Sequence, residues 1–138
     1  MSAGALRRFT PTPFKASFAL GGFDVVVSTN RQFFAHRLRD ACGSVLPDDA
    51  ERSVFDWRVV VEPNHHLQPE STSNHHLSHD GLALVTIGPN SFFACDLTKR
   101  KGVGFISQDL VDSEELFRRN LMPAFAALVK AAADLTVG

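Results

Sequence analysis

Residues 14–30 read FKASFALGGFDVVVSTN, and this stretch decides which class of fold the sequence predicts. Apolar side chains occupy every second position on either side of a Gly-Gly pair, namely Phe14, Ala16, Phe18 and Leu20 before it and Phe23, Val25 and Val27 after it. A repeat of two residues is typical of a strand with one buried face. Because Gly21-Gly22 permits positive φ at both central positions of a tight turn, we expect a β-hairpin.

Helical spacing begins directly after the hairpin. Thr29 and Gln32 have the spacing of a capping box, and the apolar residues behind them recur every three or four positions, at Phe34, Leu38, Ala41 and Val45. Gly43 is a suitable C-terminal cap, so the helix should end near Cys42. The segment VFDWRVVVE at residues 54–62 then has the apolar density expected of an interior strand.

The rest of the chain predicts a meander followed by a long helix. Turn signals at Asp80-Gly81, at residues 88–90 and at residues 98–102 separate apolar runs, which favours three or four antiparallel strands. Asp112 and Glu115 form a second capping-box pattern ahead of an apolar stripe that consists of Leu116 or Phe117, Leu121, Ala124, Leu128, Ala131 and Leu135. Pro123 should kink this helix or divide it after Asn120.

These elements predict an α+β fold with a largely antiparallel sheet in the order β-β-α-β-meander-α and helices on one face. A length of 138 residues suits one domain, which we place at residues 13–138. Residues 1–12 are small, polar and proline-containing, and we expect a mobile N-terminal lead-in there.

Composition narrows the class of protein. The net charge is −1, with 14 basic and 15 acidic residues, so a nucleic-acid-binding role is disfavoured. No stretch has the length of a membrane span or the pattern of a signal peptide, which favours a cytoplasmic protein without a membrane partner. Cys42 and Cys95 lie on different expected elements and are interpreted as small buried hydrophobic residues.

A histidine-rich stretch at residues 64–81, NHHLQPESTSNHHLSHDG, holds five of the six histidines. His75, His76 and His79 are weak candidates for metal ligands, because a helical segment would bring His75 and His79 one turn apart. The neighbouring Asn, Ser, Pro and Gly residues are instead typical of a solvated connection between strands. We therefore expect a polar loop and assign no metal.

The sequence shows no catalytic motif. It contains no GxSxG elbow and no P-loop, and neither cysteine has the surroundings of a nucleophile, so no catalytic or cofactor-binding residue and no cofactor is assigned. Lys99-Arg100-Lys101 followed by Gly102-Val103-Gly104 could cradle a phosphate, although a charged hairpin tip accounts for the same residues. This inventory favours a non-enzymatic protein and leaves enzymatic activity open.

The order of elements resembles that of one known group. FALGGFDVVVSTN, RLRDACGSVLP, FDWRVVVEP, DGLALVTIG, SFFACDL and ELFRRNLMPAFAALVK together resemble the N-terminal region of HPr-kinase-like proteins, related to the HPr serine kinase/phosphorylase. In that group a small α+β region precedes a P-loop kinase domain. The resemblance implies an accessory domain, and because no residue here matches the kinase motifs, it implies no ATP binding or phosphoryl transfer.

The leading hypothesis is therefore a non-catalytic recognition or regulatory domain that binds a protein or peptide, as an accessory to a kinase-like or other modifying enzyme. Phe33, Phe92 and Phe93 are the candidate contact residues, since Phe33-Phe34 and Phe92-Phe93 place aromatic rings on both faces of their elements, and a homodimer would also cover them. The alternative is a small-molecule or enzyme cavity between the sheet and the last helix, with Asp56, Arg58 and Asp96 as polar contacts.

Overall fold

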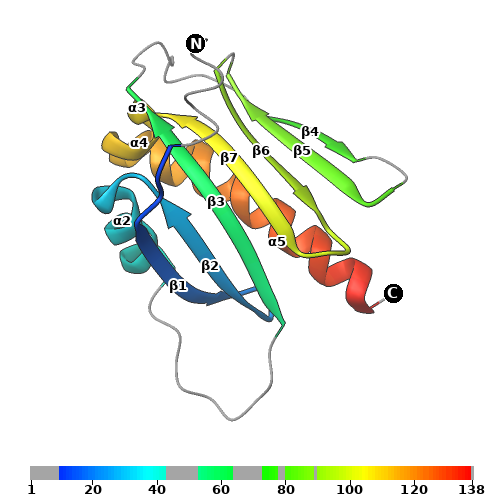
Figure 1. The fold of residues 1–138 in the computed structure, drawn as a ribbon. Helices are drawn as coiled ribbons and strands as arrows, with labels where there is room; N and C mark the ends of the chain where they lie inside the picture. Colours follow the sequence, from blue (N-terminus) through cyan, green and yellow to red (C-terminus); the bar gives the residue numbers. More distant parts are fainter. Residues whose placement is uncertain (1–9, 43–52, 64–72, 78–79, 89, 138) are drawn as a thin grey trace.

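The computed structural model describes residues 10–42, 53–63, 73–77, 80–88 and 90–137 (Figure 1). Its strands are β1 (Phe14–Leu20), β2 (Phe23–Thr29), β3 (Val54–Glu62), β4 (Ser73–Leu77), β5 (Leu82–Ile87), β6 (Ser91–Asp96) and β7 (Lys101–Ser107). Its helical elements are α2 (Gln32–Cys42), α3 (Gln108–Asp112), α4 (Glu114–Leu116), the π-helical turn η1 (Phe117–Leu121) and α5 (Met122–Val137).

All seven strands belong to one sheet, in the order β1-β2-β3-β7-β6-β5-β4. Four of the six pairings are antiparallel, and the two that β3 makes, with β2 and with β7, are parallel. The expected α+β class, the largely antiparallel sheet, the meander and the interior position of β3 are therefore confirmed. The sequence does not predict that the last strand of the meander, β7, returns to lie beside β3.

The β1–β2 hairpin closes through the expected turn. Leu20 and Phe23 are register partners, and Gly21 and Gly22 have φ values of 60° and 86°. Both angles lie in the left-handed region, which residues with a Cβ rarely adopt and which matches the twist of the flanking strands. The Gly-Gly pair thus sets the register of the first two strands.

The histidine-rich stretch differs from the sequence prediction. Residues 73–77 form β4, an edge strand in which His75 pairs with Val85 and His76 with Leu84. The prediction of a polar loop is wrong for these residues, because the exposed edge of β5 offers backbone partners that outweigh the weak strand preference of Ser and Asn. The other residues of the stretch before Asp80, 64–72 and 78–79, lie outside the described residues.

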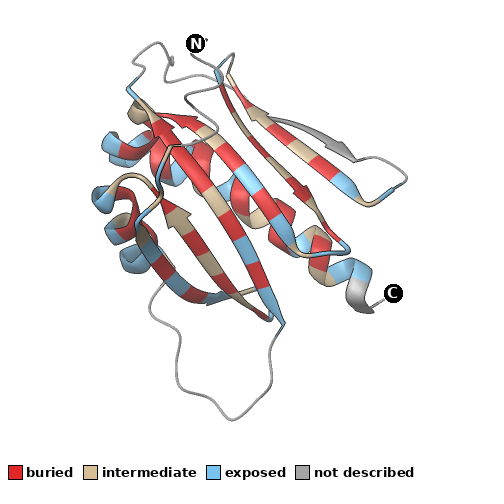
Figure 2. Cartoon of the chain, viewed as in Figure 1, coloured by how far each residue is buried: buried red, intermediate tan, exposed pale blue. Residues whose placement is uncertain are grey.

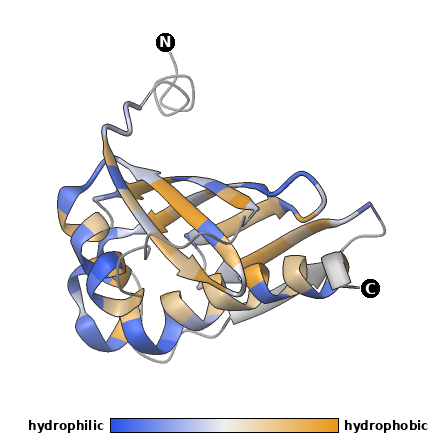
Figure 3. Ribbon diagram, turned by 90° about the horizontal axis from the view of Figure 1, so that it is seen from below, coloured by the Kyte–Doolittle hydropathy of each residue, from blue (hydrophilic) through white to orange (hydrophobic). Residues whose placement is uncertain are grey.

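Helices cover one face of the sheet, as the sequence predicts. Buried and more exposed residues alternate along β2, β5 and β6 and over most of β1, β3 and β7 (Figure 2). An edge-on view shows the helical elements along one side of the sheet only (Figure 3). We call the helix-covered side of the sheet the core face and the opposite side the open face.

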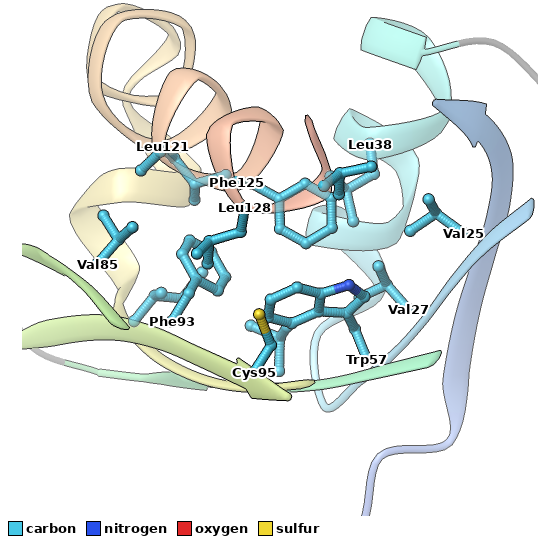
Figure 4. Packing of buried hydrophobic residues seen from close by; sticks show 14 of the residues in the cluster. Val25, Val27, Leu38, Trp57, Val85, Phe93, Cys95, Leu121, Phe125 and Leu128 are labelled. Atoms are coloured by element: carbon cyan, nitrogen blue, oxygen red, sulfur yellow. The ribbon is translucent and has the colours of Figure 1, made fainter. Parts of the chain in front are cut away.

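Trp57 is the centre of the core face (Figure 4). Its ring stacks on Phe55 with centroids 5.1 Å apart, and it contacts Phe125 of α5 at 4.9 Å and Phe93 of β6 at 5.8 Å. The Trp57 indole N–H is buried with no hydrogen-bond partner among the described residues, so packing holds the ring in place. This aromatic cluster joins strands on both sides of β7 to the last helix.

Two glycines of β7 make room for the cluster. A Cβ at Gly102, the register partner of Trp57, would lie 2.5 Å from two carbons of the indole ring. A Cβ at Gly104, the register partner of Phe93, would lie 2.7 Å from that ring. The two glycines of the GxG pattern therefore allow aromatic rings to pack closely on β7. They face the core and do not support the phosphate-cradle interpretation.

The helical region 108–137 is divided at the π-helical turn. Ser113 is the N-cap of α4, and its Oγ accepts a hydrogen bond from the backbone N–H of Leu116 at 3.2 Å. The cap therefore lies one residue after the expected Asp112. The backbone N–H of Met122 donates to the Phe117 carbonyl, five residues back. Because Pro123 has no N–H to donate, the widened turn is the means by which the helix continues past it.

The junction between β2 and α2 uses side chains of the same short segment. The Asn30 amide donates to the Val61 carbonyl at 3.0 Å and accepts from the Val61 N–H at 2.8 Å, which continues the β2–β3 ladder by one residue. In a capping box Thr29 Oγ1 would accept from the backbone N–H of Gln32. It accepts instead from the backbone N–H of Arg31 at 3.4 Å. The helix ends at Cys42, as predicted.

Replacing Gly102 with Ala should destabilise the fold by about 1–3 kcal/mol, because the new methyl group overlaps the Trp57 ring. The free energy of unfolding, measured in urea with Trp57 fluorescence as the probe, checks this. Val103→Thr on the open face of the same strand is the matched control and should change stability by less than about 0.5 kcal/mol. An unchanged midpoint for Gly102→Ala would refute the close approach of ring and strand.

Candidate functional site

The open face carries an apolar groove of about 820 Å³. The groove runs over β3, β7, β6 and β5, and its lining includes open-face residues of each of these strands, namely Asp56, Arg58, Lys101, Val103, Ala94, Asp96, Leu82 and Leu84. Leu82 is 50% exposed and Val103 is 43% exposed. Large apolar side chains that remain this accessible beside a groove are typical of a binding surface.

Strand register arranges the open face in three rows. The first row is Val60, Phe105, Phe92 and Thr86, the second is Ser28, Arg58, Val103, Ala94 and Leu84, and the third is Val26, Asp56, Lys101, Asp96 and Leu82. In the third row Lys101 is the register partner of both Asp56 and Asp96, so charges of opposite sign alternate along it. The apolar residues of the groove therefore lie beside side chains of both charge signs, so the net charge of this surface is small.

The first described residues form one wall of the groove. Residues 10–13, here called the N-terminal strap, precede β1 on the open face, where Thr12 lines the groove together with Ser28 and Arg58. The Arg58 guanidinium donates a hydrogen bond to the Thr10 carbonyl. Figure 1 shows this segment passing in front of the ends of β2 and β3, on the side away from α5.

The three polar residues proposed for a cavity do come together, although not where the sequence analysis places them. Asp56, Arg58 and Asp96 all line the groove on the open face. The expected space between the sheet and α5 is filled by the rings of Trp57, Phe93 and Phe125. The location is therefore a correction, and its cause is the odd-numbered aromatic residues of β3 and β6, which occupy the core face.

Asp96 is committed to the turn between β6 and β7. Its Oδ1 accepts hydrogen bonds from the Thr98 hydroxyl at 2.6 Å and from the backbone N–H groups of Thr98 and Lys99, both at 3.0 Å. The hydrogen bond from the Thr98 side chain, followed by that from the Lys99 backbone, lowers the pKa of the Asp96 carboxyl below its ordinary value. The turn's amides are thus used internally. Lys99 and Arg100 form a charged hairpin tip, and Lys101 begins β7, so the three basic residues do not form a phosphate cradle.

The three candidate phenylalanines lie in three different environments. Phe33 is 50% exposed on α2, with the Arg37 guanidinium 4.8 Å above its ring, whereas Phe92 packs against Phe105 on the open face at 5.5 Å. Phe93 is fully buried in the core and is therefore unavailable to a partner on the surface. Phe33 lies on the helical side, so Phe92 is the one candidate on the same face as the groove.

The metal candidates gain no support. His75 and His76 lie in a strand, so the helical spacing that would bring His75 and His79 together is not present at residues 73–77. His79 lies outside the described residues. Within the described part of the chain, no group of three or more His, Cys, Asp and Glu residues converges on a point that could hold a metal ion.

Both thiols lie in surroundings that disfavour the thiolate. Burial, with a smaller contribution from the neighbouring Asp96 carboxylate, raises the pKa of Cys95 to about 12. Burial also raises the pKa of the half-buried Cys42 thiol. A nucleophilic cysteine needs the opposite shift, so neither residue has the character of a catalytic thiol.

Sequence reasoning misses the two apolar residues that mark the groove, Leu82 and Val103. Leu82 begins the apolar run LALVTI and Val103 lies between two glycines, where each is part of a strand pattern without an assigned face. The alternation itself holds the signal, because Ala83, Val85 and Ile87 are buried and their neighbours must face the other way. Alternation shows that Leu82 and Val103 face away from the core. It indicates a binding surface only once the structure shows that no helix of the described chain covers that face.

Comparisons with protein-family models, with curated proteins and with solved structures returned no match for this chain. In the described part of the chain, no helix has the length and apolar character needed to span a membrane.

Replacing Asp96 with Ala should lower stability at neutral pH, because the ionised carboxylate accepts the bonds that close the turn. Since the pKa of Asp96 is lowered in the fold, its contribution is fully present above the ordinary Asp pKa and is lost as pH falls through the lowered value. The difference in thermal stability between wild type and Asp96→Ala should therefore shrink towards acid pH. The matched control is Asp56→Ala, in the same row but outside the turn; an equal effect of both variants at every pH would contradict the assignment.

Alkylation with iodoacetamide at pH 8 should label Cys42 before Cys95 in the folded protein. With a pKa of about 12, only about one Cys95 in ten thousand is a thiolate at that pH. Mass spectrometry of peptides after timed labelling measures both rates, and labelling in denaturant, where both should react rapidly, is the control. Rapid labelling of Cys95 in the native protein would show that β6 is not buried as described.

Proposed function

We propose that the protein is a non-catalytic recognition domain that binds a segment of a partner protein on the open face of its sheet. The observation that carries this proposal is the apolar groove on a face that no helix of the described chain covers, with Leu82 and Val103 accessible beside it. A fold that needed only to be stable would gain by covering these side chains. Phe92 and Phe105 extend the apolar surface along the same strands.

The charges beside the groove favour an apolar segment of low net charge. Lys101 lies between two carboxylates, and Arg58 already donates to a backbone carbonyl, so neither provides the concentrated positive potential that a phosphate-bearing ligand needs. Backbone carbonyls and apolar side chains are the groups that such a surface accommodates.

The resemblance to the N-terminal region of HPr-kinase-like proteins supports the same role. In that group the corresponding region accompanies a separate catalytic domain, and no residue of the present sequence matches the kinase motifs. We therefore propose that the partner is a kinase-like or other modifying enzyme, or the client of such an enzyme. A second copy of the chain is a further occupant, which the molecular mass in solution distinguishes.

A small-molecule site is the second candidate function. The groove volume of about 820 Å³ lies within the range of small-molecule pockets, and Asp56, Arg58 and Asp96 are polar residues of its lining. A ligand present at a hundred times its dissociation constant would stabilise the fold by about 2.7 kcal/mol. A thermal-melting panel of nucleotides, metals and metabolites tests this candidate, which a flat panel would not support.

Peptides selected from a random display library against the full chain should lose at least about tenfold in affinity when Leu82 and Val103 are both replaced with Ser, because each side chain contributes apolar contact area. Leu135→Ser is the matched control, since Leu135 is equally exposed, at 50%, but lies on α5. Affinities are measured by calorimetry and the molecular mass by light scattering.

The proposal fails if no peptide is selected, or if selected peptides bind the double variant as tightly as wild type. A mass of twice the chain that returns to one chain in the double variant would assign the open face to a second copy instead.

A further inference from the structure

The N-terminal strap lies on the open face, where Thr12 lines the groove and the Thr10 carbonyl accepts a hydrogen bond from Arg58. Its sequence, Thr10-Pro11-Thr12-Pro13, places a proline after each threonine. Proline fixes its own φ near −65° and biases the preceding residue towards extended backbone, so the segment favours a polyproline-type conformation. Among the described residues it is the one stretch outside the sheet that lines the groove.

The contact that holds the strap is the kind that a bound peptide would make. The Arg58 guanidinium donates to the Thr10 backbone carbonyl, a group that every peptide carries, and Thr12 lies along the groove wall. Recognition through a backbone carbonyl tolerates different side chains, and extended proline-containing segments lose little conformational freedom on binding.

Arg39 provides a useful comparison within the same fold. Its guanidinium donates to the Lys15 carbonyl at 3.2 Å, so it also binds the backbone near the N-terminus, but it does so from α2. Arg39 does not line the groove, whereas Arg58 does. Both arginines therefore anchor the backbone near the N-terminus, but only the Arg58 contact lies in the groove. Replacing each in turn distinguishes the two roles.

We infer that the open face takes an extended, proline-containing segment of the partner, with Arg58 donating to its backbone carbonyl, and that the N-terminal strap competes for this place. The inference rests on the proposed function and specifies its ligand and its regulation. A partner segment that replaces the strap gains the Arg58 contact and the groove floor at Leu82 and Val103. The strap thus lowers the apparent affinity by the fraction of molecules in which it is seated.

The test uses the full chain and a labelled synthetic peptide with the sequence of residues 9–14, FTPTPF. Replacing Pro11 and Pro13 with Gly frees the strap and leaves the groove residues of the sheet, Arg58 included, unchanged in sequence. This double-glycine variant should bind the peptide about fivefold more tightly than wild type. Adding Arg58→Ala to the double-glycine variant should then weaken binding about tenfold, because it removes a hydrogen bond from a charged donor. Fluorescence anisotropy of the labelled peptide measures each affinity.

Two controls define the outcome. Arg39→Ala in the double-glycine variant should leave the affinity within about twofold, since Arg39 lies outside the groove, and the peptide FTATAF should bind less tightly than FTPTPF. Melting temperatures confirm that every variant is folded. Equal binding by wild type and the double-glycine variant, no effect of Arg58→Ala, or no binding of FTPTPF to any variant would overturn the inference. Display-selected peptides that still depend on Leu82 and Val103 would in that case leave the proposed function standing.

Discussion

The contact between the Trp57 ring and the backbone of β7 at Gly102 is the constraint on which the rest of the fold depends. A side chain at Gly102 would overlap the indole ring, so glycine at this position lets β3 and β7 pair in the observed register without displacing the ring. With the ring in place, Phe93 and Phe125 complete a cluster that fastens the meander and α5 to β3. All large aromatic contacts of the cluster lie on the core face, which leaves the open face without a helical cover in the described chain.

Local patterns in the sequence predict most of the helices and strands, but they do not predict which distant strands pair. Alternation and the Gly21-Gly22 turn predict the first hairpin, because each depends on neighbours within a few residues. The return of β7 to the side of β3 joins residues more than forty positions apart, and single-residue patterns carry no record of that pairing. The strand at residues 73–77 is likewise a product of the edge beside it, since its own residues favour a loop.

The candidate site follows the same division. The sequence identifies Asp56, Arg58 and Asp96 as polar residues on apolar strands. Alternation alone places Asp56 and Arg58 on the face opposite Trp57, and Asp96 on the face opposite Phe93. The sequence does not show which face of the sheet the helices cover, because this depends on where α5 lies. For this reason the sequence offers Phe93 as a contact residue although it is part of the core, and passes over Leu82 and Val103 although they line the groove. The role of Gly102 in ring packing is hidden from sequence patterns for the same reason.

The most direct test of the central packing is the proton NMR spectrum of β7. If the indole ring lies on the backbone of β7, the Gly102 α protons should be shifted upfield by its ring current and should show nuclear Overhauser contacts to the Trp57 Hε3 and Hζ3 protons. The Gly104 α protons should show the same behaviour towards the Phe93 ring. Glycine α protons at ordinary shifts, with no contact to either ring, would contradict the central role of this packing and with it the division of the sheet into a core face and an open face.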